Sequence, residues 1–419
     1  MAVGFVQLTS VARAIAWIDR AFPGHLGAER LPISEALGRV LARDVAAEID
    51  APPFDRALAD GYAVEAESTL GASVYNPLTF RLGDTAAAML PRAARVAYGS
   101  PLPKGADAVV PGDHVQENVA SETFELIEQV AAGANIERVG NGFSRTNLLL
   151  RAGRFIRPSY LGLLAEAGIG SVEVVRRPRV RVIVTGQDLI EAGNELLGGA
   201  VFDADTPMLQ GLVERDGGTV ETCAADRRCS HAIREAIRAA DADLVVVVGG
   251  SGLGANDEMV LEALGRPASG DGDGLSIHGI ALQPGSSTGM GRIDAMPLFL
   301  LPGAPPACLW AYEILTGRAV RRLAGRPAEL PYSQREFVTA RKIVSNIGFL
   351  EVWPVRLVAG GDFVEPVSAA APGGAGGLFP TVAEADGFVL VPEASEGIPQ
   401  GTHARVYLYD DRKLGLEHV

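Results

Sequence analysis

The sequence predicts a multidomain protein that combines a doubly wound α/β domain with separate β-rich parts. From about Val180 to Arg321, apolar strands alternate with helical segments, which is typical of a parallel sheet covered by helices. After Arg326-Pro327, short β-branched and aromatic runs follow one another without helical segments, so a small β-barrel or sandwich is expected. Between residues 79 and 110, short strands joined by Gly/Pro loops predict a small β-rich domain.

Composition narrows the class of protein. The chain has 419 residues, with 51 acidic and 37 basic residues and a net charge of −14. This balance argues against general nucleic-acid binding, which needs a basic surface. The three cysteines form no close metal-ligand pair or disulfide framework, which favours a reducing cytoplasm. Charged residues interrupt the apolar N-terminal stretch, and no run is long enough to span a membrane, so neither a signal peptide nor a membrane partner is expected.

The N-terminal segment predicts two helices. Thr9 or Ser10 can cap the first, whose apolar residues from Val11 to Phe22 fall on one face. Ser34 is predicted to cap a second helix. Its expected apolar stripe consists of Leu37, Val40 and Leu41.

Two loops before the α/β region carry charged residues with open roles. In residues 51–64 a Pro-Pro pair and an Asp60-Gly61 turn frame Asp55 and Asp60, which are either turn formers or carboxylates facing a cleft. Lys104 lies in the Gly/Pro loop that follows and is more simply a solvated lysine. Arg138 and Arg145 are possible anion contacts.

The α/β region is organised around residues 242–257, a buried strand that runs into a glycine-rich loop. Strand, glycine loop and helix together suit an anion, because amide N–H groups and the helix dipole favour phosphate-like charge. Taken alone, a plain structural turn is the simpler interpretation. Ligands of doubly wound folds sit at the carboxyl ends of the strands. Four segments lie at such ends: 185–188, Asp226, 249–257 and 302–305.

These loops together resemble one family, the MoeA-type molybdopterin molybdenumtransferases, whose animal relative is the gephyrin E domain. The similar stretches keep family order over nearly the whole chain. They are 52–55 with 60–64, 99–110, 176–180 with 185–189, 249–254 with Asp257, and 301–305.

The resemblance implies an elongated homodimer of four-part subunits. The expected parts are an N-terminal helical and linker domain (1–50 and 147–177), a small β-rich domain (51–146), a MogA-like α/β molybdopterin-binding domain (178–327) and a C-terminal β-barrel (328–412). The family's cleft lies between the α/β domain of one subunit and the small β-rich domain of the other.

The resemblance also implies molybdenum cofactor biosynthesis: molybdate enters adenylyl-molybdopterin and AMP is released, with Mg²⁺ or another divalent cation. The expected partners are a MogA-like adenylyltransferase and acceptor molybdoenzymes. The expected catalytic residues are Asp60, Asp188, Asp226 and Asp257, and the last three are also the expected metal ligands. The expected substrate-binding residues are Thr185, Gly186, Gly249, Gly250, Ser251, Gly252, Gly254, Pro302, Gly303, Pro305, Ser100 and Arg138.

Several positions depart from the family pattern. The loop in which the family has lysines reads Gln283-Pro284-Gly285-Ser286-Ser287 here, which removes the expected cationic clamps. The family's Glu and Asn are Asp188 and Asp205, and its Glu-Asp run reads Asn141-Gly142. Two hypotheses therefore stand: a working enzyme with a changed site, or a non-catalytic relative that binds or delivers the cofactor. AMP release separates them.

Overall fold

The computed structural model describes residues 7–83, 91–118, 122–186, 189–196, 198–225, 229–254, 257–265, 272–358, 362–367 and 379–410. The chain divides into two compact units, Glu29–Val174 and a unit made of Met1–Ala28 with Val175–Val419. The unit made of Met1–Ala28 and Val175–Val419 is called the main unit, and Glu29–Val174 is called the second unit. No described helix has the length and apolar character needed to cross a membrane.

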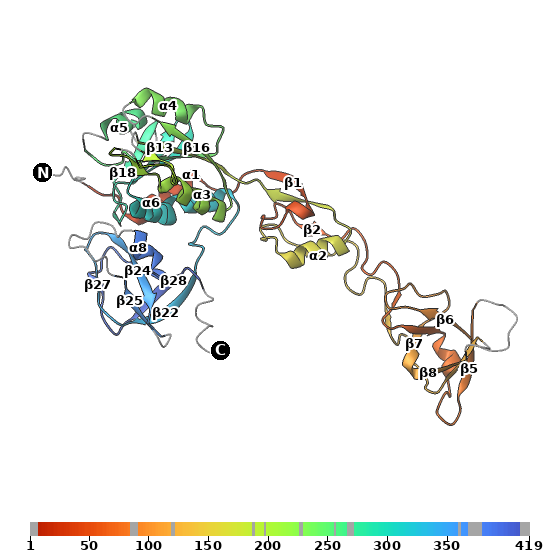
Figure 1. Cartoon of the computed structure of the whole chain (residues 1–419). Helices are drawn as coiled ribbons and strands as arrows, with labels where there is room; N and C mark the ends of the chain where they lie inside the picture. The colour runs from red at the N-terminus through yellow and green to blue at the C-terminus, as the bar shows by residue number, and fades with distance from the viewer. Residues whose placement is uncertain are drawn as a thin grey trace. The chain divides into compact units, whose positions relative to one another are not determined.

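A six-stranded sheet forms the centre of the main unit (Figure 1). The first four neighbouring strands are parallel, the fifth is antiparallel to them, and the sixth is antiparallel to the fifth. In spatial order they are β16 (Thr219–Ala225), β13 (Arg179–Thr185), β17 (Leu244–Val248), β21 (Met296–Leu301), β20 (Gly289–Ile293) and β18 (Gly274–His278). Every residue of β17 is buried, as its continuous apolar run predicts for a strand covered on both faces.

Helices cover both faces of this sheet, so the domain is doubly wound as predicted. Alternate residues of β17 belong to two different cores: Leu244, Val246 and Val248 to one, Val245 and Val247 to the other. In Figure 1, α4 and α5 lie on one side and α3 and α6 on the other. The helices are α3 (Asp205–Arg215), α4 (Ser230–Arg238), α5 (Glu258–Leu264), α6 (Pro305–Ala311), the π-helical η4 (Tyr312–Thr316) and α7 (Gly317–Leu323).

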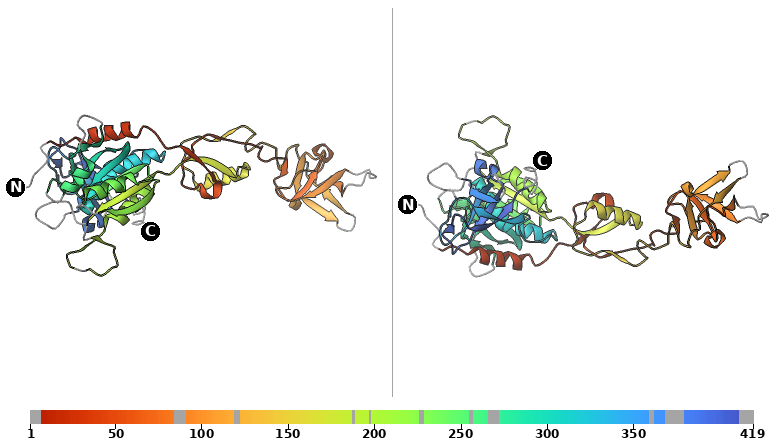
Figure 2. Two further views of the ribbon diagram at one scale, coloured as in Figure 1. Left: turned by 90° about the horizontal axis from the view of Figure 1, so that it is seen from above. Right: turned by 90° about the horizontal axis from the view of Figure 1, so that it is seen from below.

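The first helix, α1 (Val11–Ala21), belongs to the main unit. Ser10 caps it, since the Ser10 Oγ accepts the Arg13 N–H at 3.3 Å. Trp17 packs edge-on against Phe299 of β21, with ring centroids 6.4 Å apart. Figure 2 shows α1, in red, against the α/β domain. The prediction grouped residues 1–50 with the linker domain, whereas the apolar face of α1 is buried in the α/β core.

The C-terminal part is a barrel of five strands. Each strand pairs with two others in the closed ring β24–β25–β22–β28–β26. Their bounds are β22 (Ser333–Thr339), β24 (Leu350–Leu357), β25 (Phe363–Pro366), β26 (Gly387–Val391) and β28 (His403–Leu408), with β23 (Ile343–Val344) pairing β27 (Gly397–Ile398). A short helix, α8 (Phe379–Ala383), departs from the helix-free prediction.

A strand of the α/β domain extends the barrel sheet. β19 (Leu282–Gln283) pairs in parallel with the start of β24, and the Leu350 N–H donates to the Ala281 carbonyl at 2.8 Å. The segment that follows β19 is therefore held by the barrel as well as by its own domain.

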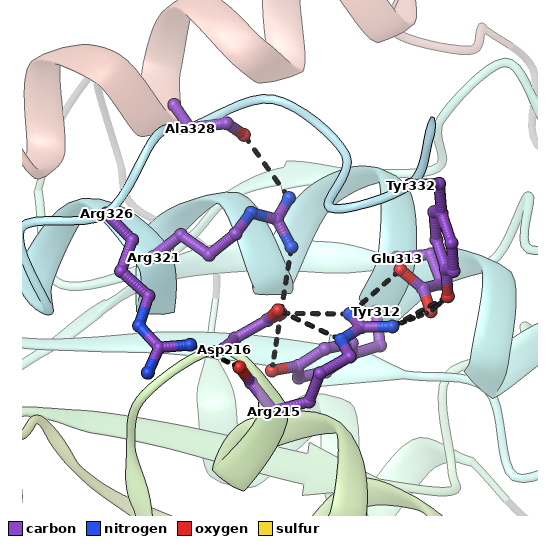
Figure 3. Close-up of polar contacts among 8 residues, drawn as sticks. All are labelled: Arg215, Asp216, Tyr312, Glu313, Arg321, Arg326, Ala328 and Tyr332. Atoms are coloured by element: carbon purple, nitrogen blue, oxygen red, sulfur yellow. Dashed lines mark hydrogen bonds and ion pairs between the residues drawn. The ribbon is translucent and has the colours of Figure 1, made fainter. Parts of the chain in front are cut away.

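A buried charge network joins α3, η4 and the chain that enters the barrel (Figure 3). Glu313 accepts two bonds from the Arg215 guanidinium (2.6 and 3.0 Å) and one from the Tyr332 hydroxyl (2.6 Å). Asp216 accepts from Arg321 at 2.8 Å and also bonds Arg215. The charges of Arg215 and Arg321 thus balance those of Glu313 and Asp216, and Arg326 donates to the Arg215 carbonyl. Burial lowers the pKa of Arg215, but its two carboxylate partners outweigh this and raise it.

The second unit contains the β-rich domain and the linker. A six-stranded sheet has the order β7-β4-β6-β5-β9-β8 and encloses a core with Phe80 stacked on Phe124. The strands are β4 (Gly61–Val64), β5 (Leu78–Leu82), β6 (Arg92–Val96), β7 (Ala108–Pro111), β8 (Val115–Asn118) and β9 (Thr123–Leu126), with 3₁₀ turns η2 (Ala66–Thr69) and η3 (Gly112–His114).

The remaining elements are short pairs and one helix. β3 (Arg56–Ala57) pairs β10 (Ile136–Glu137), β2 (Val45–Ala46) pairs β11 (Leu148–Leu150), β1 (Ala28–Pro32) pairs β12 (Ser171–Val175) and, in the main unit, β14 (Leu189–Ile190) pairs β15 (Val201–Phe202). The linker helix is α2 (Pro158–Glu166).

The helix predicted after Ser34 is wrong. Only a 3₁₀ turn, η1 (Ile33–Glu35), forms there. Gly38 follows with φ +74°, a left-handed conformation that ends a helix, and Leu37 is 51% exposed, so the apolar spacing does not build a buried stripe.

Candidate functional site

Three parallel strands end together at one edge of the α/β sheet. β13 ends at Thr185, β17 at Val248 and β21 at Leu301. The Thr185 hydroxyl donates to the Val248 carbonyl at 2.9 Å, and the Gly249 N–H donates to the Leu301 carbonyl at 3.0 Å. These bonds fix the starting points of the loops that follow.

The loop after β17 requires glycine at its first two positions. Gly249 and Gly250 have φ of +88° and +67°. A Cβ on Gly249 would lie 2.9 Å from the Thr185 carbonyl oxygen, and one on Gly303 would lie 3.1 Å from the Gly249 Cα. The loops that contain Gly186, Gly249 and Gly303 are therefore in close contact, backbone against backbone.

The glycine loop offers hydrogen-bond donors that have no acceptor in the described part of the chain. Within the described residues, no acceptor pairs with the N–H groups of Gly250, Ser251, Gly252 or Leu253. Consecutive donors of this kind form an anion-binding concavity. The Asp257 Oδ2 accepts the Gly254 N–H at 3.0 Å, which holds a carboxylate against the same loop.

Ser251 is held from two sides. Its side chain is buried, and its Oγ lies 2.7 Å from the Ser287 Oγ. The His278 Nε2, from the end of β18, lies 2.8 Å from the Ser251 carbonyl oxygen and donates to it as the Nε2–H tautomer. Ser287 belongs to the loop after β19, so this loop and the glycine loop meet at their hydroxyls.

Asp205, the first residue of α3, is a buried carboxyl with an unusual titration. Burial raises its pKa to about 7, against a hydrogen bond from the Cys308 thiol that lowers it, and the nearby charge of Asp203 raises it further. Its Oδ1 has no partner in the described part of the chain. Asp203 caps the helix instead, because its Oδ1 accepts the N–H groups of Asp205 and Thr206 at 3.1 and 3.0 Å.

The predicted residues from the α/β domain gather in part. Thr185 and Gly186 end β13, and Gly249 to Gly254 with Asp257 form the neighbouring loop. Pro302, Gly303 and Pro305 form the turn from β21 into α6. Asp188 and Asp226 lie outside the described residues, so the predicted metal set of Asp188, Asp226 and Asp257 stays a prediction. Among the residues that are described, no group of three or more His, Cys, Asp or Glu could hold a metal ion.

The other predicted residues lie in the second unit. The Asp60 Oδ1 accepts the Tyr98 N–H at 2.7 Å, and the Ser100 carbonyl accepts the Ala57 N–H at 3.0 Å. Arg138 pairs with Asp55 at 2.6 Å. Bonds from the Val139 N–H and from Arg138 lower the pKa of Asp55, so this carboxylate holds Arg138 in place.

Sequence reasoning missed the roles of Ser287, His278 and Cys308. Ser287 enters the sequence analysis only as part of the loop that lacks the family's lysines, and its bond to Ser251 joins residues 36 apart in sequence. No periodic pattern reports such a contact. A Ser-Ser pair directly after a Pro-Gly turn was the one available signal.

The comparisons with known proteins follow this geometry. Three family models match in order: the MoeA N-terminal region (domain I and II) at residues 9–168, a probable molybdopterin binding domain at 183–322, and the MoeA C-terminal region (domain IV) at 336–409. Molybdopterin molybdenumtransferase 2 of Mycobacterium tuberculosis is 34% identical over 309 residues, which cover 71% of this chain and 75% of that protein. The chain belongs to the MoeA family of molybdopterin molybdenumtransferases.

Other relatives agree with this membership. A putative molybdopterin biosynthesis protein of Methanocaldococcus jannaschii is 29% identical over 91% of this chain and 92% of its own length. The crystal structure of the molybdopterin biosynthesis MoeA protein from Pyrococcus horikosii matches with a TM-score of 0.78 at 30% identity, and covers 96% of this chain and 100% of that one. This MoeA member therefore has the family's multidomain fold.

Proposed function

We propose that this MoeA family member is a molybdopterin molybdenumtransferase that inserts molybdate into adenylyl-molybdopterin and releases AMP. The phosphoanhydride of the substrate is cleaved, AMP leaves, and molybdenum remains on the dithiolene. One observation carries the proposal: the N–H groups of residues 250–253, which no described residue accepts, lie beside the Asp257 carboxylate at the carboxyl edge of the sheet. Donors and a carboxylate so placed suit a phosphate-containing substrate that reacts at phosphorus.

The residues of this edge divide the work. The amides of the glycine loop bind phosphoryl oxygens, which stabilises the charge that develops when the anhydride breaks. The turn at Pro302 and Gly303 packs against Gly249 and keeps that loop in shape. Asp257, whose Oδ2 accepts the Gly254 N–H, orients a water molecule or molybdate toward the phosphorus.

We propose that Mg²⁺ assists at this edge. Asp257 offers the oxygen ligand that this hard cation prefers, and Asp188 and Asp226 are the other proposed ligands. A bound cation would screen the charge of the phosphoryl oxygens. The segments 249–257, 283–287 and 301–305 contain no lysine or arginine, so no other cation is supplied by these loops.

We also propose a cytoplasmic homodimer in which Asp60, Ser100 and Arg138 of a second copy complete the site. Family resemblance supports this proposal, together with the ordered Asp55–Arg138 pair. A MogA-like adenylyltransferase that supplies the substrate, and molybdoenzymes that take the product, are the proposed partners.

The test is AMP release from adenylyl-molybdopterin, with molybdate and Mg²⁺ present and with each omitted. The proposal predicts AMP only when both are present, matched by molybdenum bound to the pterin. Asp257→Ala should abolish turnover while the chain stays folded. Saturable substrate binding with no AMP from the wild-type chain would refute the enzyme and would favour a cofactor carrier.

A further inference from the structure

We infer that Ser287 is a positioning residue that holds Ser251 in place and, with it, a set of uncharged hydrogen-bond donors for a tetrahedral oxyanion. This inference rests on the proposed function. It adds Ser287 to the site and assigns oxyanion binding to uncharged donors. Ser287 does not belong to the predicted site, and the hydroxyl pair, not a cation, is what the two facing loops share.

The glycine loop and the loop after β19 both present backbone N–H donors. The N–H groups of Gly250 to Leu253 are unused, as are those of Ser286 and Ser287, among the residues that the structure describes. The Ser251 and Ser287 hydroxyls lie 2.7 Å apart between these two sets. Six amides therefore belong to two loops that meet at this hydroxyl pair. One hydroxyl of the pair donates to the other, so one hydroxyl hydrogen remains for a ligand, and all of these donors are uncharged. Amide and hydroxyl donors hold oxyanions without a formal charge when they are fixed in place beforehand.

Ser287 is firmly fixed in its loop. The loop leaves β19, which is paired to β24 of the barrel. It returns at Thr288, which is fully buried and donates to the Gly285 carbonyl through both its hydroxyl (2.7 Å) and its N–H (3.1 Å). The Ile280 N–H also donates to the Ser286 carbonyl at 2.9 Å. The hydroxyl of Ser287 is thus presented from a rigid turn.

The fixed position of Ser287 has a consequence for Ser251. Its neighbours in the loop are glycines, so little side-chain packing orients it. His278 holds its carbonyl and Ser287 holds its hydroxyl. Without the Ser287 hydroxyl, Ser251 loses its one side-chain bond in the described structure, and only the bond from His278 to its carbonyl still holds this residue.

The absence of charge on these donors determines how oxyanion binding depends on salt concentration. A lysine in this loop would attract any anion, and its effect would fall as salt increases. Neutral donors depend on geometry instead, so oxyanion binding here should vary less with ionic strength. The oxyanion is either molybdate or a phosphoryl group of the nucleotide-linked substrate, since both are tetrahedral.

The test uses the full chain and its Ser287→Ala, Ser287→Thr, Ser287→Lys and Ser286→Ala variants. Equilibrium dialysis with inorganic molybdate, and separately with inorganic phosphate, measures binding without turnover. Loss of one neutral hydrogen bond predicts that Ser287→Ala weakens binding of one of them about 3- to 10-fold. Ser287→Thr keeps a hydroxyl and should restore most of this. Ser286→Ala, whose hydroxyl has no bond to a described residue, should cost less than Ser287→Ala.

Kinetics separate positioning from structural damage. Ser287→Ala should raise KM for only one substrate, molybdate or adenylyl-molybdopterin, with the unfolding temperature unchanged. Ser287→Lys should make binding steeper in salt than in the wild-type chain. Equal dissociation constants for the wild-type and Ser287→Ala chains would overturn the inference even if AMP is released. A wild-type chain that binds molybdate through Ser287 but releases no AMP would refute only the proposed function.

Discussion

Removing Glu313 should destabilise the main unit by far more than removing any exposed carboxylate. Glu313 is 1% exposed and accepts three hydrogen bonds, two of them from Arg215. In Glu313→Leu, the buried network keeps two cations and only one carboxylate. Breaking a buried pair in this way costs about 3–5 kcal/mol, because an uncompensated charge remains away from water.

The matched control is Asp241→Ala. Asp241 also makes a two-pronged pair with an arginine, Arg179, at 2.6 and 2.8 Å, but its side chain is 82% exposed. Exposed pairs contribute about 0–1 kcal/mol. The two substitutions therefore remove the same type of interaction and differ in burial.

Urea unfolding followed by tryptophan fluorescence is the assay. The chain has three tryptophans, Trp17, Trp310 and Trp353, and all lie in the main unit. The signal therefore reports the unit that contains the network. With a slope of about 3 kcal/mol per M, Glu313→Leu should lower the urea midpoint by about 1 to 1.7 M. The double variant Arg215→Met/Glu313→Leu should recover part of this loss. A midpoint shift no larger than that of Asp241→Ala would refute the reasoning.

Three further predictions concern titration and the loops. Asp205→Asn should raise the free energy of unfolding above pH 7 by at most about 4 kcal/mol. The folded pKa of about 7 lowers wild-type stability as the pH rises from the unfolded pKa near 4 to about 7. The free energy of unfolding of the variant should therefore change less with pH over that window, and an unchanged pH dependence would contradict the prediction. Gly252→Ala places a Cβ 2.6 Å from the Asp257 Oδ2 and should lower kcat of AMP release at least about 10-fold, whereas Gly211→Ala, with open space around it in α3, should not lower it. Burial raises the pKa of Asp243, but bonds from Arg176 and Arg179 outweigh this and lower it. Its contribution to stability is therefore present above about pH 4 and is lost as the pH falls through the folded pKa. In Asp243→Asn, the free energy of unfolding should fall less steeply with decreasing pH below about pH 4.

Patterns that act over a few residues allowed most of the fold to be predicted. The five-residue apolar run of β17 indicates a strand covered on both faces, and Ser10 before an amphipathic stretch indicates the start of α1. The same logic failed after Ser34, where the left-handed Gly38 limits the backbone to a single turn. Propensity is a weak guide when one residue fixes the backbone angle.

The site was predictable where it depends on chain order and hidden where it depends on distant contacts. Glycines after a strand indicate a loop that approaches a ligand, so Gly249 and Gly250 could be chosen from the sequence. The Ser251–Ser287 bond spans 36 residues, and the Arg215–Glu313 pair spans 98. Such pairs form only after the sheet has assembled, so no local pattern reveals them.

β19, the strand of the α/β domain that pairs with β24 of the barrel, makes the folding of these two domains interdependent. β19 completes its hydrogen bonds only when β24 is in place, and residues 284–288 follow it directly. In a nascent chain, residues 284–288 therefore reach their final arrangement only after β24 (Leu350–Leu357) has been synthesised. A chain shortened at residue 327 should keep the glycine loop yet bind oxyanions poorly. For the same reason, exchanging the barrels of two relatives would alter the position of residues 284–288, which contact the glycine loop through Ser287.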